Sequence, residues 1–195
     1  MVNYPNGKKK AYTSKPTSAG GRGMVLEKDI NVTNMFYLSI DKAVIHKKPT
    51  PVTIVKVDYP ARSAAKITEA YFKLPSTTDY NGLWHGKYID FEAKETNSAT
   101  SFSLTNIHKH QIEHMDKILK QGGITFIIVR FKKNNRTFIL PFKKFLYYQI
   151  RAENGGRKSI KLTEFENTAF ELSFHYKIRL DYLDVIKTNE SEFLI

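Results

Sequence analysis

The sequence contains no cysteine among its 195 residues, which excludes disulfide bonds and thiolate metal sites. It has no apolar run that approaches the roughly 20 residues of a membrane-spanning helix. Its beginning also lacks the apolar core of a secretory signal, and neither a P-loop nor a G-x-G-x-x-G motif is present. We therefore expect a cytoplasmic protein with no membrane segment and no glycine-rich nucleotide site.

Acidic residues are scarce, with 19 Asp and Glu against 31 Lys and Arg, so the formal net charge is +12. A field of this sign favours association with polyanions, and nucleic acid is the first candidate. Residues 1–23 contain several cations and no acid. We predict that they form a flexible basic arm that neutralises DNA phosphates, the alternative being a solubilising tail.

Hydrophobic periodicity predicts a fold of the α/β (α+β) class, in which helices flank a mixed β-sheet. Residues 24–195 are expected to form one domain. Residues 60–72 fit either a helical connection or a protruding basic hairpin. The expected helices are 24–39, a helix from an N-cap at Thr105 or Asn106 to Gln121, and 142–151; the expected strands are 43–48, 52–57, 88–96, 124–131 and 137–140.

The segment Tyr88–Thr96 is the most informative part of the chain. If it is a strand, then Asp90, Glu92 and Lys94 share one face, because successive side chains alternate. An Asn81-Gly82 turn would fold Asp79 back beside them. This pattern predicts a metal-binding catalytic strand, although an exposed strand face with a cross-strand salt bridge would give the same pattern.

Asp79, Glu92 and Lys94 together suit phosphodiester hydrolysis. Carboxylate oxygens bind hard divalent cations such as Mg²⁺, and an adjacent ammonium stabilises charge that develops on the phosphorus centre. A rival motif, H-x-x-E-H, spans His110 to His114 and is typical of one class of zinc peptidase. No third zinc ligand is apparent downstream, and the chain is strongly basic, so the metallopeptidase is a remote alternative.

Several long blocks, in order along the chain, closely resemble the RecU family of Holliday junction resolvases. They include Gly21-Arg22-Gly23-Met24, His46-Lys47-Lys48-Pro49-Thr50-Pro51-Val52, Val57-Asp58-Tyr59-Pro60, Ser76-Thr77-Thr78-Asp79-Tyr80-Asn81-Gly82, Tyr88-Ile89-Asp90-Phe91-Glu92-Ala93-Lys94-Glu95-Thr96 and His110-Gln111-Ile112-Glu113-His114-Met115. The resemblance implies a homodimeric, Mg²⁺-dependent endonuclease with the restriction-endonuclease-like core of the PD-(D/E)xK superfamily. Mn²⁺ could take the place of Mg²⁺. Such enzymes resolve four-way DNA junctions by paired nicks during recombination and repair.

The resemblance also implies roles for particular residues. It places metal ligands at Thr77, Asp79, Glu92 and Gln111 and the transition-state lysine at Lys94. Glu27 resembles a helix acid of related nucleases, and Asp90 is expected to support the site without binding metal. A projecting stalk is expected at about 60–76.

Contacts to DNA phosphates are expected from basic residues of the arm, the stalk and the segment before it. Recombinase or branch-migration proteins are expected as further partners. A protein that binds branched DNA without cleaving it is the alternative to the nuclease. The predicted DNA contacts are Lys8, Lys9, Lys10, Arg22, Lys47, Lys48, Arg62, Lys66 and Lys73.

Overall fold

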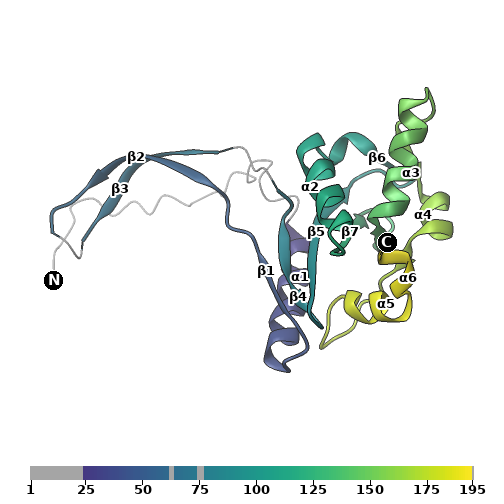
Figure 1. Cartoon of the computed structure of the whole chain (residues 1–195), viewed down its shortest axis with the longest axis horizontal. Coiled ribbons are helices and arrows are strands. Elements are labelled where there is room, and N and C mark those ends of the chain that lie inside the picture. The colour runs from purple at the N-terminus through teal and green to yellow at the C-terminus, as the bar shows by residue number, and fades with distance from the viewer. Residues whose placement is uncertain (1–23, 62–63, 74–76, 195) are drawn as a thin grey trace, which may run out of the picture.

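A computed structural model describes residues 24–61, 64–73 and 77–194, and shows a body of helices around a sheet from which a long hairpin projects (Figure 1). The predicted arm at 1–23 and the predicted contacts Lys8, Lys9, Lys10, Arg22 and Arg62 lie outside the described residues. The helices are α1 (Met24–Ser39), α2 (Lys109–Lys120), α3 (Phe142–Glu153), α4 (Leu162–Thr168), α5 (Tyr182–Thr188) and α6 (Glu190–Phe193), with a 3-10 turn η2 (Leu104–Asn106).

The central sheet has six strands in the order β1-β4-β5-β7-β8-β10. Strand β5 pairs with β4 in antiparallel and with β7 in parallel fashion, so the sheet is mixed. Its strands are β1 (Val44–Lys47), β4 (Tyr80–Trp84), β5 (Lys87–Thr96), β7 (Ile124–Phe131), β8 (Arg136–Pro141) and β10 (Phe170–Glu171). A smaller sheet pairs β6 (Ser101–Ser103) with β9 (Ser159–Lys161).

Separate hydrophobic clusters cover the two faces of the sheet. One cluster joins Phe91 and Phe126 to residues of α1, α5 and α6, with rings of Phe91 and Phe126 stacked at 4.6 Å. The other joins β7 and β8 to α2, α3 and α4, through residues such as Met115 and Phe145. Because helices bury both faces, every residue of β7 is buried, and apolar residues predominate on both of its faces. The predicted fold class, a mixed sheet flanked by helices, is confirmed.

The predicted turn at Asn81-Gly82 is wrong, because both residues lie inside β4. The two-residue turn between β4 and β5 is His85-Gly86, and both residues have positive φ, 48° and 77°. Positive φ at both central positions is the type I′ geometry that suits the twist of a β-hairpin. Gly82 serves a different purpose: a Cβ there would lie 2.1 Å from the carbonyl oxygen of Val44 on β1.

Residues around the predicted 60–76 stalk form a hairpin, not a helix. Strand β2 (Val52–Asp58) pairs only with β3 (Lys66–Phe72), and their residues are almost all exposed. The projection therefore begins before the predicted range, at β2. Figure 1 shows both strands leading away from the body, and β1 and β4 lie at their base.

Two other boundaries differ from prediction. Helix α2 begins after His108 rather than after Thr105 or Asn106, because the side chain of Gln111 caps its first turn. Strand β6 lies in a segment for which no strand was predicted. Within the described ranges, no helix is both long and apolar enough to cross a membrane.

Candidate active site

Asp79 and Glu92 lie together where β4 begins. The backbone N–H of Asp79 donates to Glu92 Oε2 at 3.1 Å, and the N–H of Ala93 donates to Asp79 Oδ2 at 3.4 Å. Antiparallel pairing of β4 with β5 causes this contact, because Tyr80 is opposite Phe91 and the preceding residue must lie beside Glu92. Asp79 is thus folded beside Glu92 as predicted, through the paired strands.

Glu92 is completely buried, which is costly for a carboxylate. Burial and, to a lesser extent, the charge of Asp79 raise the pKa of Glu92 to about 7, while Lys94 opposes the shift. The Lys94 ammonium forms an ion pair with Glu92 Oε1. This contact is the one that opposes the rise in the pKa of Glu92. The site therefore holds a buried carboxylate in contact with a cation.

Lys94, Asp79 and Glu27 line a single cavity of about 320 Å³. Lys94 comes from β5, and Glu27 comes from the first turn of α1. Glu27 also forms an ion pair with Lys47 of β1. Cations and acids therefore alternate around the opening in front of Asp79, and the acid expected from α1 lies at its rim.

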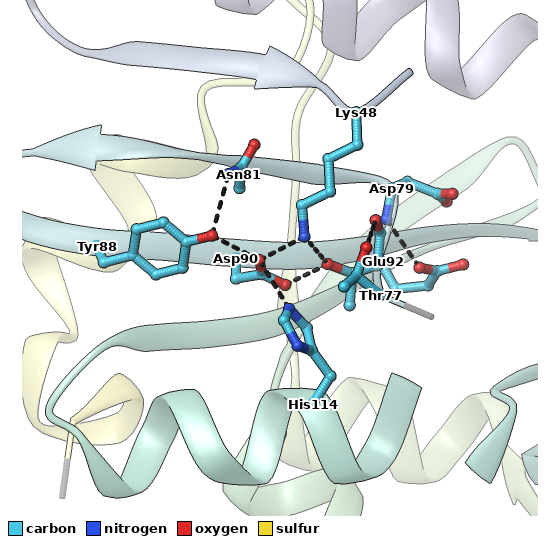
Figure 2. A network of polar contacts seen from close by, with 9 residues as sticks. Lys48, Thr77, Asp79, Asn81, Tyr88, Asp90, Glu92 and His114 are labelled. Atoms are coloured by element: carbon cyan, nitrogen blue, oxygen red, sulfur yellow. Dashed lines mark hydrogen bonds and ion pairs between the residues drawn. The ribbon is translucent and has the colours of Figure 1, made fainter. Parts of the chain in front are cut away.

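Thr77 and Gln111 are related to this centre in different ways. Thr77 lines a second cavity together with Asp79, and Figure 2 shows it beside Asp79 and Glu92. Gln111 is buried on α2, where its Oε1 accepts the backbone N–H of His108 at 2.9 Å. No hydrogen bond joins Gln111 to Asp79 or Glu92 in the described part of the chain. An amide oxygen has two lone pairs, so this cap leaves one of them for another partner.

Asp90 is also fully buried and is the centre of a separate polar network (Figure 2). Its Oδ2 lies 2.7 Å from Lys48 Nζ, 3.2 Å from the Tyr88 hydroxyl and 3.2 Å from His114 Nε2. Its Oδ1 accepts a hydrogen bond from the hydroxyl of Thr78. The carboxylate is saturated by protein donors, in contrast to Glu92.

The histidines do not form the site of a zinc peptidase. His114 contacts Asp90, whereas the ring of His110 stacks on that of His108 at 5.6 Å. No group of three or more His, Asp or Glu side chains suited to a metal occurs among the residues that the structure describes. The geometry therefore favours the acid pair, which would need oxygen ligands of other types to complete a metal site.

The predicted DNA contacts that the structure describes fall into two groups. Lys66 and Lys73 are exposed on the hairpin. Lys47 and Lys48 instead engage acids of the body, Glu27 and Asp90 respectively, and only 17% of the Lys48 side chain is exposed. Lys48 is therefore placed as an internal partner of Asp90.

Comparison with known proteins shows the family of the chain. The family described as "Recombination protein U", RecU, matches residues 21–188. The chain belongs to the RecU family. A "Holliday junction resolvase RecU" of Listeria welshimeri is 52% identical over 195 residues, covering 95% of this chain and 97% of the relative. RecU proteins of Oceanobacillus iheyensis and Staphylococcus aureus strain JH9 are 52% and 51% identical; the latter alignment covers 98% of this chain and 99% of the relative.

Sequence reasoning missed the partners of Asp90 within this RecU chain. Lys48, Thr78, Tyr88 and His114 come from four separate places in the sequence. Only Tyr88 carried a local signal, since it lies two residues before Asp90 on the same strand face. The other three meet Asp90 through β1–β4 pairing and the packing of α2 against β5.

Proposed function

We propose that this protein is a divalent-metal-dependent endonuclease that resolves Holliday junctions in recombination and DNA repair. The Asp79–Glu92–Lys94 cluster carries the proposal: Asp79 and Lys94 line an open site, and the buried Glu92 contacts both of them, on a strongly basic chain. The RecU relatives supply the junction as the substrate, because their names describe Holliday junction resolvases. A site of this kind requires no thiol or histidine ligand.

The residues present fit a hard divalent cation, and Mg²⁺ is the metal we propose, with Mn²⁺ as a substitute. Carboxylate oxygens of Asp79 and Glu92 are the ligand type such ions prefer, and the two acids lie side by side. In this proposal Thr77, which lines a cavity with Asp79, adds a hydroxyl oxygen, and Gln111 adds an amide oxygen. When bound, the metal polarises the scissile phosphate and lowers the pKa of an attacking water.

The protein's own groups prepare the site for this chemistry. Asp79 and Glu92 are held together by backbone hydrogen bonds, so they need little rearrangement. Lys94 keeps a positive charge in the same cavity, where it stabilises negative charge that develops on the phosphate. Its ion pair with Glu92 also fixes the lysine on the catalytic side of β5.

We further propose that the β2–β3 hairpin is the stalk that contacts the junction. It carries exposed aromatic side chains, including Phe72 at 85% and Tyr71 at 61% exposure, together with Lys66 and Lys73. Aromatic faces stack on unpaired bases, and lysines neutralise phosphates. The basic segment at 1–23 would add further phosphate contacts.

Symmetrical cleavage of two strands needs two active sites, so we propose a twofold homodimer. Recombinase or branch-migration proteins are proposed as partners, and the bacterial cytoplasm as the location, because the junctions that such enzymes cut form in chromosomal DNA.

The test is to incubate the protein with a mobile four-way junction or a linear duplex of equal length, in Mg²⁺, Mn²⁺ or chelator. We expect paired nicks on the junction alone that require metal and are lost in Asp79→Ala, Glu92→Ala and Lys94→Ala. Glu113→Ala is the matched control, since Glu113 is an exposed acid of α2 that forms an ion pair with Lys109 outside the site. Tight junction binding without cleavage in either metal would favour the non-catalytic alternative.

A further inference from the structure

Asp90 holds both ends of the β2–β3 hairpin against the catalytic strand. Lys48, which precedes β2, donates to Asp90 Oδ2 at 2.7 Å. Thr78, which follows β3, donates its hydroxyl to Asp90 Oδ1. Lys48 Nζ also donates to Thr78 Oγ1 at 3.0 Å, so the two ends are joined to each other as well as to Asp90 (Figure 2).

The same two ends hold Asp79. Thr78 is its neighbour in the chain, and the backbone N–H of Lys48 donates to the Asp79 carbonyl oxygen at 2.8 Å. A cavity of about 190 Å³ lies beside the hairpin ends and is lined by Lys48, Pro51, Thr77 and Asp79. The hairpin ends are therefore not closely packed at this point. The Asp90 network therefore adds side-chain connections to the β1–β4 and β4–β5 pairing that holds this part of the backbone.

The buried charge of Asp90 and the largely buried charge of Lys48 make their connection costly to break. Removing one partner from a buried ion pair leaves the other charge uncompensated, which is strongly destabilising. Tyr88 and His114 occupy the remaining acceptor positions of Asp90, so the network is fully satisfied and favours a single arrangement. Because His114 lies on α2, its contact with Asp90 connects this helix to the same network.

We propose that Asp90 is a positioning residue: it clamps Lys48 and Thr78 so that the placement of Asp79 beside Glu92 depends on how the hairpin is seated. The proposal rests on the proposed function, in which the hairpin contacts branched DNA and Asp79 binds metal. Junction arms that press on the hairpin then act on Asp79 through Thr78 and Lys48. The protein would then distinguish four-way junctions from other DNA in the cleavage step as well as in binding.

Thr78→Val is the informative variant, because it replaces the hydroxyl with a methyl group of similar size and leaves every carboxylate in place. It therefore separates clamping from direct metal binding by Asp90. Thr78→Ser keeps the hydroxyl and serves as the rescue. Asp90→Asn weakens the clamp from the other side, since an amide has one acceptor oxygen where the carboxylate has two. Asp29→Asn is the matched control: Asp29 also pairs with a buried cation, Arg130 at 2.8 Å, on a different part of the body.

Hydrogen exchange in chelator, without DNA, tests the clamp independently of catalysis. We expect the amides of Lys48 and Asp79 to exchange at least about 10-fold faster in Thr78→Val and Asp90→Asn. Thr78→Ser should remain near wild type, and Asp29→Asn should leave these two amides unchanged. Unaltered exchange in Thr78→Val and Asp90→Asn, or acceleration spread evenly over the whole body, would overturn the proposal.

Single-turnover cleavage of a bound four-way junction completes the test. We expect Thr78→Val to lower the cleavage rate by about 10- to 100-fold, with the junction Kd unchanged and the rate restored in Thr78→Ser. Faster exchange at Asp79 with a wild-type cleavage rate would refute the positioning role. If the wild-type protein cleaves no junction, the proposed function fails, and the exchange result still decides whether the clamp exists.

Discussion

The backbone N–H of Asp79 donates to Glu92 Oε2 at 3.1 Å, so the two acids proposed to hold metal are joined through the main chain. The backbone N–H of Ala93, the residue after Glu92, donates a hydrogen bond to Asp79 Oδ2 at 3.4 Å. Strand pairing therefore brings the two carboxylates together, and the burial of Glu92 beside Asp79 is a consequence of the fold.

The first prediction concerns pH and the metal-free protein. The pKa of Glu92 is raised from 4.5 to about 7 by burial and then by Asp79. The folded state thus binds a proton more tightly than the unfolded state, and this contribution to stability is complete below the unfolded pKa. It is lost as pH rises through about 7. In chelator, the free energy of unfolding of the wild type should therefore fall with rising pH relative to Glu92→Gln, by about 3 kcal/mol at most.

Urea denaturation of both proteins across this pH range measures the difference. The Glu92→Gln variant lacks the titrating group and provides the reference curve. Parallel curves for the two proteins would show that Glu92 ionises in the folded state as easily as in the unfolded state.

The second prediction concerns the metal as a stabilising ligand. Because Mg²⁺ should bind the folded chain and not the unfolded one, a concentration of 10 Kd should add about 1.4 kcal/mol to the free energy of unfolding. Asp79→Asn and Glu92→Gln should lose most of this gain. Glu113→Gln should keep it, since that exposed acid pairs with Lys109 outside the site. Thermal denaturation over a Mg²⁺ titration checks this, and equal gains in all four proteins would place the metal elsewhere.

The third prediction concerns Gly82 and the edge of the sheet. A Cβ at this position would lie 2.1 Å from Val44 O and 2.6 Å from Ile45 Cα, which is backbone that cannot move without separating β1 from β4. Gly82→Ala should lower the free energy of unfolding by more than about 3 kcal/mol or prevent folding, through overpacking and a lost strand pair.

Gly86→Ala is the contrasting substitution in the same hairpin. Gly86 has φ 77° but open space around it, so alanine there should cost only about 1 kcal/mol for the left-handed backbone. Chemical denaturation of the two variants separates crowding from conformational strain. Similar losses in both would argue that Gly82 is needed for its backbone angles instead.

Alternation of side chains in the sequence predicted the orientation of β5. Alternation from Ile89 to Lys94 predicted that Phe91 faces the core, and Phe91 is buried between Tyr80 and Phe126. It also predicted one shared face for Asp90, Glu92 and Lys94. Alternation could not predict that this face is covered by α2, because the burial of Asp90 and Glu92 depends on the contact of α2 with β5.

The turn at Asn81-Gly82 shows why local signals fail at such places. Asn-Gly is favoured in two-residue turns, yet here it lies in the middle of β4 and the turn is His85-Gly86. Glycine is required at position 82 by the close approach of β1, a strand that comes more than thirty residues earlier, from Val44 to Lys47. Because the β2–β3 hairpin separates β1 from β4 in the sequence, the residues next to Gly82 give no signal of this pairing.

The last prediction concerns the hairpin lysines. Lys66 and Lys73 are exposed at opposite ends of β3, where neither forms an ion pair with an acid in the described residues. If each neutralises one phosphate, the double variant Lys66→Ala/Lys73→Ala should make the slope of log K against log salt less steep by about 2. The double variant Lys177→Ala/Lys187→Ala is the control, because these exposed lysines lie at and near α5, at the opposite end of the molecule from β2 and β3 (Figure 1). Junction affinity measured at several salt concentrations decides between them, and equal slopes in the wild type and the hairpin variant would show that the hairpin contributes no phosphate contact through these lysines.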